Sequence, residues 1–414
     1  MMFEHDNQRL ANDNASLAAI ESSGRDAALS RPRVLIFSQR NLSPRTLFRA
    51  PHYEFEDIIT QIDSAEILAP QGKSWFKWGY ETAMRLAWHC PVILDPGVVK
   101  PVVTNSYDIF FALCGSPADL LMVNTLGDPR KFARVSICLL DELWVKELAA
   151  AKHFVQLLKK FDVVILYYSQ SVKSVGDAAG CRCIFMPPGI DAILFCPYPA
   201  MPKRTVDVYS IGRRSDRTHQ AFLKMADDSG LFYIHDSVSG DRAINLKEHR
   251  SLFANIAKRS RYFVVNPALI DRPDKRGTQM EIGNRFFEGA AAGAIMIGER
   301  PGNEEFEKLF DWPDAVIDLP FGSGDVEGVI QRVDSDPEWQ EEMRKNNVVN
   351  TLMRHDWVYR WEAVLQVAGL QPTEGIFERK ERLRHLAMDI SASHCAASGR
   401  VNKPDYASSC RDDV

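Results

Sequence analysis

Two arginines stand in a sequence pattern that suits an anion-binding site. Residues 210–219, SIGRRSDRTH, place Gly212 and Arg213 directly after an apolar run and Arg217 at the start of the next helical segment. Glycine lets the backbone approach a ligand closely, and a guanidinium group can form paired hydrogen bonds with anionic oxygens. The N-terminus of a helix also favours a bound anion. We therefore expect these residues to bind an anion, with a run of solvated surface arginines as the alternative.

A pair of acids follows another apolar run. Asp141 and Glu142 come directly after residues 133–140, ARVSICLL. Open α/β sheets bind their ligands at the carboxyl ends of strands, where a carboxylate can take a proton from a hydroxyl or stabilise positive charge. The alternative is structural: Asp141 would open an amphipathic helix that runs to Lys160 and would stabilise its first turn. The sequence leaves both interpretations open.

The elements that must position these residues follow from recurring apolar runs. Each run is short enough for a strand that is buried on both faces, and amphipathic segments of helical length separate most of the runs. The runs occupy residues 34–38, 65–70, 107–114, 133–140, 162–168, 183–188, 206–212, 231–236, 261–267, 293–299 and 314–320. Strands that alternate with helices predict parallel, doubly wound sheets. With a proline-rich linker at residues 196–204, the pattern predicts an α/β protein of two tandem Rossmann-like domains.

The predicted boundaries divide the chain into four parts. Residues 1–31 are polar and aperiodic and are expected to form a flexible arm, with at most one short helix near residues 15–21. Residues 32–200 form the first domain and residues 201–370 the second. Residues 371–414 are expected to contain one amphipathic helix, FERKERLRHLAMDI, followed by a disordered tail.

Composition limits the class of partner and the compartment. The formal net charge of −5 over 414 residues gives no basic field for a nucleic-acid backbone, so nucleic acid is not an expected partner. We expect no signal peptide and no transmembrane segment, because no apolar run approaches ~18 residues; peripheral membrane contact stays open. The eight cysteines lack metal-binding spacing and are interpreted as reduced thiols of a cytoplasmic protein.

Three segments together resemble the GT-B glycosyltransferases, particularly the retaining family-4 or "glycosyl transferases group 1" type. Residues 281–299, EIGNRFFEGAAAGAIMIGE, are similar to the donor-binding motif of that family, and residues 210–219 are similar to its Gly-Arg loop. Residues 186–197, MPPGIDAILFCP, resemble the family pattern at the end of the first domain, with Pro188 where Asn is usual. Gly189 in this segment is expected at positive φ. The resemblance implies that the two domains face each other across a cleft.

The resemblance also implies a nucleotide-sugar site on the second domain. Glu288 matches the glutamate that accepts hydrogen bonds from the ribose hydroxyls, a contact that suits a carboxylate because it only accepts. The loop arginines match those that clamp the donor diphosphate. The predicted donor-binding residues are Gly212, Arg213, Arg217, Asn284, Arg285 and Glu288, with Lys275 and Arg276 as further candidates. Glu281 stands seven positions before Glu288, whereas the family has its earlier glutamate eight positions before.

On the first domain the resemblance is weaker. Relatives often carry a His-Asp pair followed by an aromatic residue where Asp141, Glu142 and Trp144 stand, so Asp141 and, after it, Glu142 are the predicted catalytic residues. The first loop lacks the family's Gly-rich turn. His52, Arg45 and Arg49 lie near that loop and are candidates for binding an anionic or sugar acceptor, with solvated loop cations as the alternative.

These observations predict a glycosyltransferase of the hexosyltransferase type. It would move a sugar from a nucleotide-sugar donor to a carbohydrate or lipid-linked acceptor, in a role such as surface polysaccharide biosynthesis. No cofactor and no metal are expected, because no Asp-X-Asp pair stands at a strand end and Arg213 and Arg217 would supply positive charge instead. Two alternatives stay open: a nucleotide-sugar epimerase on the same fold, and a catalytically silent protein that binds sugar nucleotides.

Overall fold

The first domain is built on a six-stranded parallel sheet in the order β2-β1-β3-β4-β5-β6. The computed structural model describes residues 31–237, 240 and 242–398, so the predictions for the N-terminal arm and for the tail beyond residue 398 lie outside it. The strands of this sheet are β1 (Val34–Phe37), β2 (Ala65–Leu68), β3 (Tyr107–Cys114), β4 (Ala133–Leu140), β5 (Val163–Leu166) and β6 (Cys183–Phe185).

The second domain carries a five-stranded parallel sheet in the order β11-β10-β9-β7-β8. Its strands are β7 (Val206–Ser210), β8 (Tyr233–His235), β9 (Ser260–Val265), β10 (Ile295–Gly298) and β11 (Ile317–Asp318). Ten of the eleven predicted apolar runs contain one strand each, and β9 begins one residue before the run at 261–267. The two parallel sheets with helices on both faces confirm the predicted α/β class.

Burial on both faces explains why these runs form strands. In β1, Val34 and Ile36 pack into one core cluster, whereas Leu35 and Phe37 pack into another on the opposite face. All four side chains are at most 1% exposed. Continuous apolar sequence is what a parallel strand covered by helices on both faces requires.

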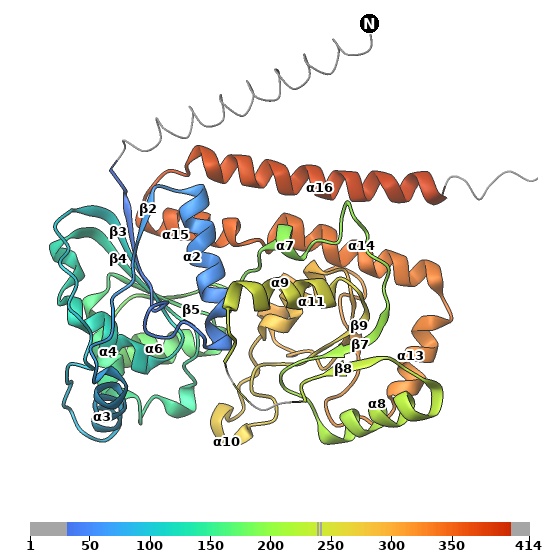
Figure 1. The fold of residues 1–414 in the computed structure, drawn as a ribbon, viewed down its shortest axis with the longest axis horizontal. Helices are drawn as coiled ribbons and strands as arrows, with labels where there is room; N and C mark the ends of the chain where they lie inside the picture. The colour runs from blue at the N-terminus through green and yellow to red at the C-terminus, as the bar shows by residue number, and fades with distance from the viewer. Residues whose placement is uncertain (1–30, 238–239, 241, 399–414) are drawn as a thin grey trace, which may run out of the picture.

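Helices cover both sheets, and Figure 1 shows the two domains side by side. Those of the first domain are α2 (Ala50–Ile62), α3 (Phe76–His89), α4 (Leu120–Val123), α5 (Lys152–Val155), α6 (Val172–Ala179) and α7 (Ala192–Phe195). Those of the second are α8 (Asp216–Ser229), α9 (Leu246–Ala257), α10 (Pro273–Arg276), α11 (Asn284–Ala291), α12 (Glu304–Leu309), α13 (Val326–Asp334) and α14 (Pro337–Arg354). No described helix is long and apolar enough to cross a membrane.

The last two helices return to the first domain. The Trp357 ring of α15 (Trp357–Ala368) stacks on Phe55 of α2, with the ring centroids 4.6 Å apart. Trp361 Nε1 donates to Asp63 Oδ2 over 2.7 Å. The final helix, α16 (Glu374–Ser398), packs along α14 and α2 and lies across both domains (Figure 1). Helix α15 therefore packs on the first domain, although it falls within the range assigned to the second.

Two local predictions were wrong. Asp141 does not open a helix: residues 141–144 are irregular, and a 3-10 turn at Val145–Glu147 precedes the short α5. Tertiary contacts explain this, because Trp144 is fully buried and Val145 N donates to Gln279 of the other domain over 2.7 Å. Gly189 is not among the glycines at positive φ; a Cβ there would lie 2.6 Å from the Trp357 ring, so close packing requires the glycine.

Candidate functional site

Strand order places the candidate site. In each sheet the first strand of the chain lies between the second and the third. The chain first moves to one side of that strand and then crosses back to the other side, so a switch point lies between β1 and β3 and another between β7 and β9. Ligands of open α/β sheets bind outside the carboxyl ends of the strands at such points. Gly212 and Arg213 follow β7, and Asp141 follows β4, the neighbour of β3.

Asp141 is paired with a histidine that lies far away in the sequence. His52 Nε2, in the first turn of α2, is 2.9 Å from Asp141 Oδ2. The histidine side chain is 3% exposed, whereas the aspartate is 20% exposed. When Asp141 is ionised it can only accept, so the bond fixes a proton on Nε2 of His52. Asp141 is therefore the more exposed member of the pair, and the buried His52 fixes the orientation of its carboxylate.

Glu142 lies in the electrostatic field of two cations from the second domain. Burial and the charge of Asp141 raise the pKa of Glu142, while a hydrogen bond from Trp144 and the charges of Lys275 and Arg213 oppose that rise. Glu142 Oε1 accepts from Trp144 Nε1 over 3.0 Å. The structure thus brings Glu142 of the first domain into the field of two predicted cations of the second.

The loop after β7 has a backbone conformation that favours glycine at position 212. Gly212 adopts φ +93°, which favours glycine, and its N–H donates to Asp236 over 2.6 Å. Arg213 Nη1 donates to Asp271 Oδ2 over 3.1 Å, and its side chain is 47% exposed. Arg217 in the first turn of α8 is also exposed, but it packs beside Gly324. The side chains of Arg213 and Arg217 therefore contact different parts of the second domain.

Glu288 is buried within an ion-pair network. Its side chain on α11 is 1% exposed, and Arg250 and Arg285 each donate to one of its carboxylate oxygens. Burial opposes ionisation, but the two arginines outweigh it and lower the pKa of Glu288. The predicted contact between Glu288 and the ribose would compete with these bonds and stays a prediction, as does the role of Asn284, which begins α11.

Arg250 extends the network into the first domain. Arg250 Nε, on α9, donates to Glu54 Oε2 of α2 over 2.7 Å. Glu54 also accepts from Trp357 Nε1 over 2.8 Å and from the backbone N–H of Asp191 over 2.9 Å. Glu54 and Arg250 are each 8% exposed. One buried cation thus lies between a carboxylate of each domain.

Sequence reasoning missed Arg250 and Glu54 and gave His52 only a minor role. A signal was present: Arg250 occupies the buried face of α9 together with Leu246, Phe253 and Ala254. A polar residue at a core position of an amphipathic helix indicates a buried partner. The sequence does not say which partner.

Arg49 near the first loop is not available to an anion, whereas the predicted role of the exposed Arg45 side chain stays a prediction. Arg49 donates from both terminal nitrogens to Asp119, over 2.7 and 3.0 Å, and is 6% exposed. The backbone oxygen of Arg45 accepts from Ala243 of the second domain over 2.8 Å. The proposal that Arg49 binds an anionic acceptor is therefore wrong, because its charge is neutralised inside the fold.

A second interdomain contact is made by residues just before α11. Glu281 is 1% exposed and accepts from the backbone N–H groups of Ser169 and Gln170, each over 3.1 Å. Gln279 Nε2 donates to Ser171 Oγ over 3.0 Å. Glu281, whose spacing from Glu288 differs from that of the family, thus links the second domain to the loop after β5.

Glu281 is expected to make stability fall as pH rises. Burial raises the pKa of Glu281 from 4.5 to about 7. The folded state therefore holds this proton more tightly, and its contribution to stability is full below pH 4.5 and is lost as pH rises to about 7. The shift corresponds to about 3 kcal/mol. Denaturant unfolding of wild type and Glu281→Gln at pH 4.5 to 8 should show their stability difference change in this direction; a constant difference would contradict the assignment.

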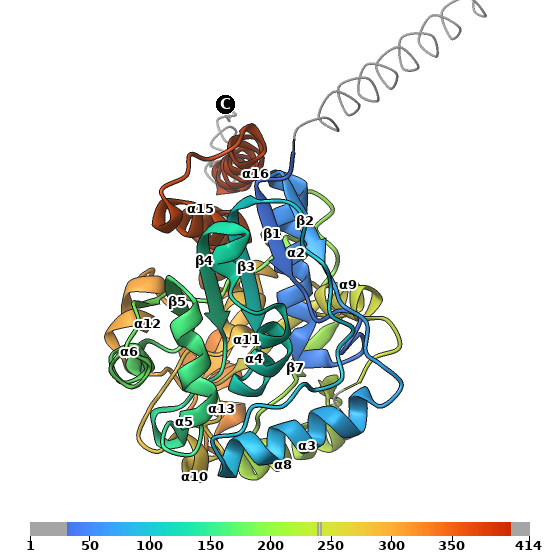
Figure 2. The ribbon, with the colours of Figure 1, turned by 90° about the vertical axis from the view of Figure 1, so that its left-hand side faces the viewer.

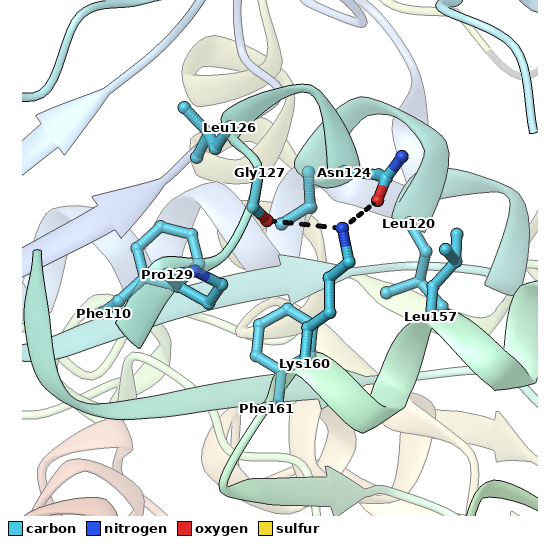
Figure 3. A pocket seen from close by; sticks show the side chains of 10 residues that line it. Phe110, Leu120, Asn124, Leu126, Gly127, Pro129, Leu157, Lys160 and Phe161 are labelled. Carbon is cyan, nitrogen blue, oxygen red and sulfur yellow. Dashed lines mark hydrogen bonds between the residues drawn. The ribbon is translucent and has the colours of Figure 1, made fainter. Parts of the chain in front are cut away.

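Two pockets differ in their relation to the site. The pocket in Figure 3 is lined by Phe110 of β3, by Pro129 shortly before β4 and by Phe161 shortly before β5, so it lies away from the carboxyl ends of the strands. Lys160 Nζ donates there to Asn124 and to the backbone oxygen of Gly127. The other pocket lies at the carboxyl ends of β7 and β9, where Ser210, Arg214 and Asn266 line it. The second pocket therefore adjoins the loop of Gly212.

Comparison with known proteins agrees with this architecture. A family model described as "Glycosyl transferase-like" matches residues 217–366. An alpha-glucosyltransferase solved with UDP-glucose and DNA containing an abasic site has a TM-score of 0.52 at 13% identity, covering 81% of this chain and 99% of that one. The N-terminal domain of Candida albicans trehalose-6-phosphate phosphatase has a TM-score of 0.51 at 10% identity, covering 82% and 98%. No curated protein matches the sequence. The chain therefore has the GT-B fold, and its residues 217–366 form a glycosyl transferase-like region of the second domain.

Proposed function

We propose that this protein is a glycosyltransferase that moves a hexose-type sugar from a nucleotide-sugar donor to an acceptor hydroxyl. The observation that carries the proposal is the arrangement across the two domains. Asp141 and Glu142 stand at the carboxyl end of β4, and the positive charges of Arg213 and Lys275 act on Glu142 from the second domain. The glycosyl transferase-like match of residues 217–366 supports this class of chemistry.

Each side of this arrangement suits one half of the transfer. As the donor bond breaks, negative charge grows on the departing diphosphate, and cations held near it stabilise the transition state more than the ground state. Asp141 would accept the acceptor proton in an inverting reaction, or would orient the acceptor in a retaining one. His52 would hold the carboxylate in the required orientation through its Nε2.

Support for the donor comes from the pocket and the neighbours. The pocket at Ser210, Arg214 and Asn266 adjoins the Gly212 loop, where a nucleotide attached to the bound diphosphate would lie. Solved structures of similar fold carry UDP-glucose or UDP. A UDP-sugar is therefore the first donor to test, with GDP-sugars next. Asn284, Arg285 and Glu288 are retained as donor-side residues in this proposal.

For the acceptor we propose a carbohydrate or a lipid-linked saccharide. Helix α3 and the segment after it lie on the outside of the first domain (Figure 2). Trp75, just before α3, Trp78 within it and Val102 after it are 42%, 69% and 83% exposed, a surface suited to an amphiphilic acceptor or to peripheral membrane contact. A role in surface polysaccharide biosynthesis and a cytoplasmic location stay predictions.

An assay of donor turnover tests the proposal. Purified protein is incubated with UDP- and GDP-hexoses, with and without free saccharides, lipid-linked saccharides in vesicles, or duplex DNA. We expect acceptor-dependent release of nucleoside diphosphate with one donor and a saccharide acceptor. Isomerised donor without release indicates an epimerase, binding without turnover indicates a silent protein, and transfer to DNA overturns the acceptor assignment.

The same assay tests metal independence. Arg213, Lys275 and Arg285 would supply positive charge at the diphosphate, so turnover is expected to survive an excess of EDTA. Activity that is lost in EDTA and restored by Mn²⁺ would overturn this part of the proposal. Donor binding is followed in parallel by thermal shift, because binding to the folded state raises stability by mass action.

A further inference from the structure

A buried carboxylate that accepts from two arginines lies next to the proposed diphosphate site. Arg250 Nη1 donates to Glu288 Oε1, and Arg285 Nη1 donates to Glu288 Oε2. The far end of the network is Glu54, which accepts from Arg250. Two arginines and two glutamates thus balance in charge. An anion that binds one of the two arginines would do so at the end of the network that is open to solvent.

Arg285 is that exposed end. Its side chain is 33% exposed, whereas those of Arg250, Glu54 and Glu288 are at most 8% exposed. Arg285 Nε donates to the backbone oxygen of Ile211 over 3.3 Å. Within the described part of the chain, Arg285 Nη2 has no hydrogen-bond partner.

The Gly212 loop lies against the Arg285 guanidinium. A Cβ built at Gly212 would be 3.6 Å from Arg285 Nε and 3.9 Å from Nη2. The guanidinium carbon also lies 4.9 Å from the centroid of the Phe253 ring. The bonds to Ile211 and Glu288 fix the plane of the guanidinium and leave Nη2 for a ligand at the loop.

We propose that Glu288 is a positioning residue: it holds Arg285 so that Nη2 binds the diphosphate, and it makes no contact with the ribose. The proposal rests on the proposed donor site and gives Glu288 a different role from the one that the family resemblance implies. Each carboxylate oxygen of Glu288 already accepts from an arginine, and the side chain is 1% exposed. A ribose hydroxyl could therefore reach Glu288 only if the side chains that cover it moved.

Inorganic pyrophosphate is a direct probe, because it carries two phosphates and no ribose. Binding of pyrophosphate and of UDP is measured by calorimetry for wild type, Glu288→Gln, Arg285→Gln, the double variant and Glu54→Gln. Arg285→Gln should weaken both ligands roughly 10-fold or more, as expected for a lost charged hydrogen bond. Glu288→Gln should weaken both ligands severalfold, and the double variant should be no weaker than Arg285→Gln.

Glu54→Gln is the matched control. Glu54 belongs to the same network and is similarly buried, but it lies on the far side of Arg250 from the Gly212 loop. A purely structural role of the network would make Glu54→Gln and Glu288→Gln weaken pyrophosphate equally. The positioning role predicts that Glu54→Gln lowers stability but leaves pyrophosphate affinity within about twofold.

Comparison of UDP with 2′,3′-dideoxy-UDP tests the ribose contact. If Glu288 bound the ribose, Glu288→Gln would weaken UDP, spare pyrophosphate and remove the difference between UDP and its dideoxy analogue; that result overturns the inference. If Glu288→Gln does not fold, Glu288→Asp retains the charge, retracts it by one methylene and is scored by the same criteria. Wild type that binds neither ligand would instead overturn the proposed donor site.

Discussion

Replacing Asp141 by asparagine is expected to lower turnover by roughly 10²- to 10⁴-fold, the usual contribution of a positioned general base. Asparagine has nearly the same shape as aspartate but cannot take up the acceptor proton at neutral pH. Its side-chain oxygen can still accept from His52 Nε2, so the local arrangement survives. Donor affinity should stay unchanged, because the proposed donor residues belong to the second domain. Nucleoside diphosphate release, UDP affinity and melting temperature are measured on the same preparation.

The structure makes this substitution more informative than the sequence did. No helix begins at Asp141, so the substitution removes no helix cap, and a fall in turnover at constant melting temperature reports chemistry. Asp108→Asn is the matched control, because Asp108 lies in β3 of the same sheet, at the opposite end, and is 46% exposed. Near-normal turnover in Asp141→Asn, with a large loss in Glu142→Gln, would move the base to the neighbouring residue.

Replacing Arg250 by alanine is expected to lower the free energy of unfolding by about 3–5 kcal/mol, as when one partner of a buried ion pair is removed. Glu54 and Glu288 would keep their buried positions without the cation between them. The stacking of the guanidinium on Phe195, 4.5 Å from the ring centroid, would also be lost. Because Arg250 joins α9 to α2, the loss should include weaker contact between the domains.

The pH dependence of this effect has a definite sign. Loss of Arg250 leaves Glu54 without an ion pair and Glu288 with Arg285 alone. Both changes raise the pKa of a buried carboxylate in the folded state, so the stability lost in Arg250→Ala should increase from pH 5 to pH 8. Urea unfolding at both pH values measures the loss, with Arg384→Ala as the control. Arg384 pairs with Glu381 on α16, both about half exposed, and should change stability by at most about 0.5 kcal/mol. A loss below 1 kcal/mol in Arg250→Ala would show that the network contributes little.

Much of the fold was readable from local sequence because burial leaves a local pattern. A strand covered on both faces must be apolar along its length, and residues 107–114 and 133–140 show this without reference to anything distant. The loop of Gly212 was also placed correctly between a strand and a helix, but its positive φ was not predicted, and the positive φ expected at Gly189 was wrong. The sequence also showed that Pro188 and Glu281 depart from the family pattern, but it did not show that Glu281 contacts the first domain.

What the tertiary structure alone decided was the partner of each buried polar group. His52 and Asp141 are 89 residues apart, and Glu54 and Arg250 are 196 residues apart. A charged side chain carries no sequence mark of the element that will pack over it, but once buried it must find a partner because an unpaired charge is costly there. The packing of α2 against α9 and β4 therefore determined which residues form the site. Glu288, read from the sequence as a free acceptor, acquired two arginine partners by the same requirement.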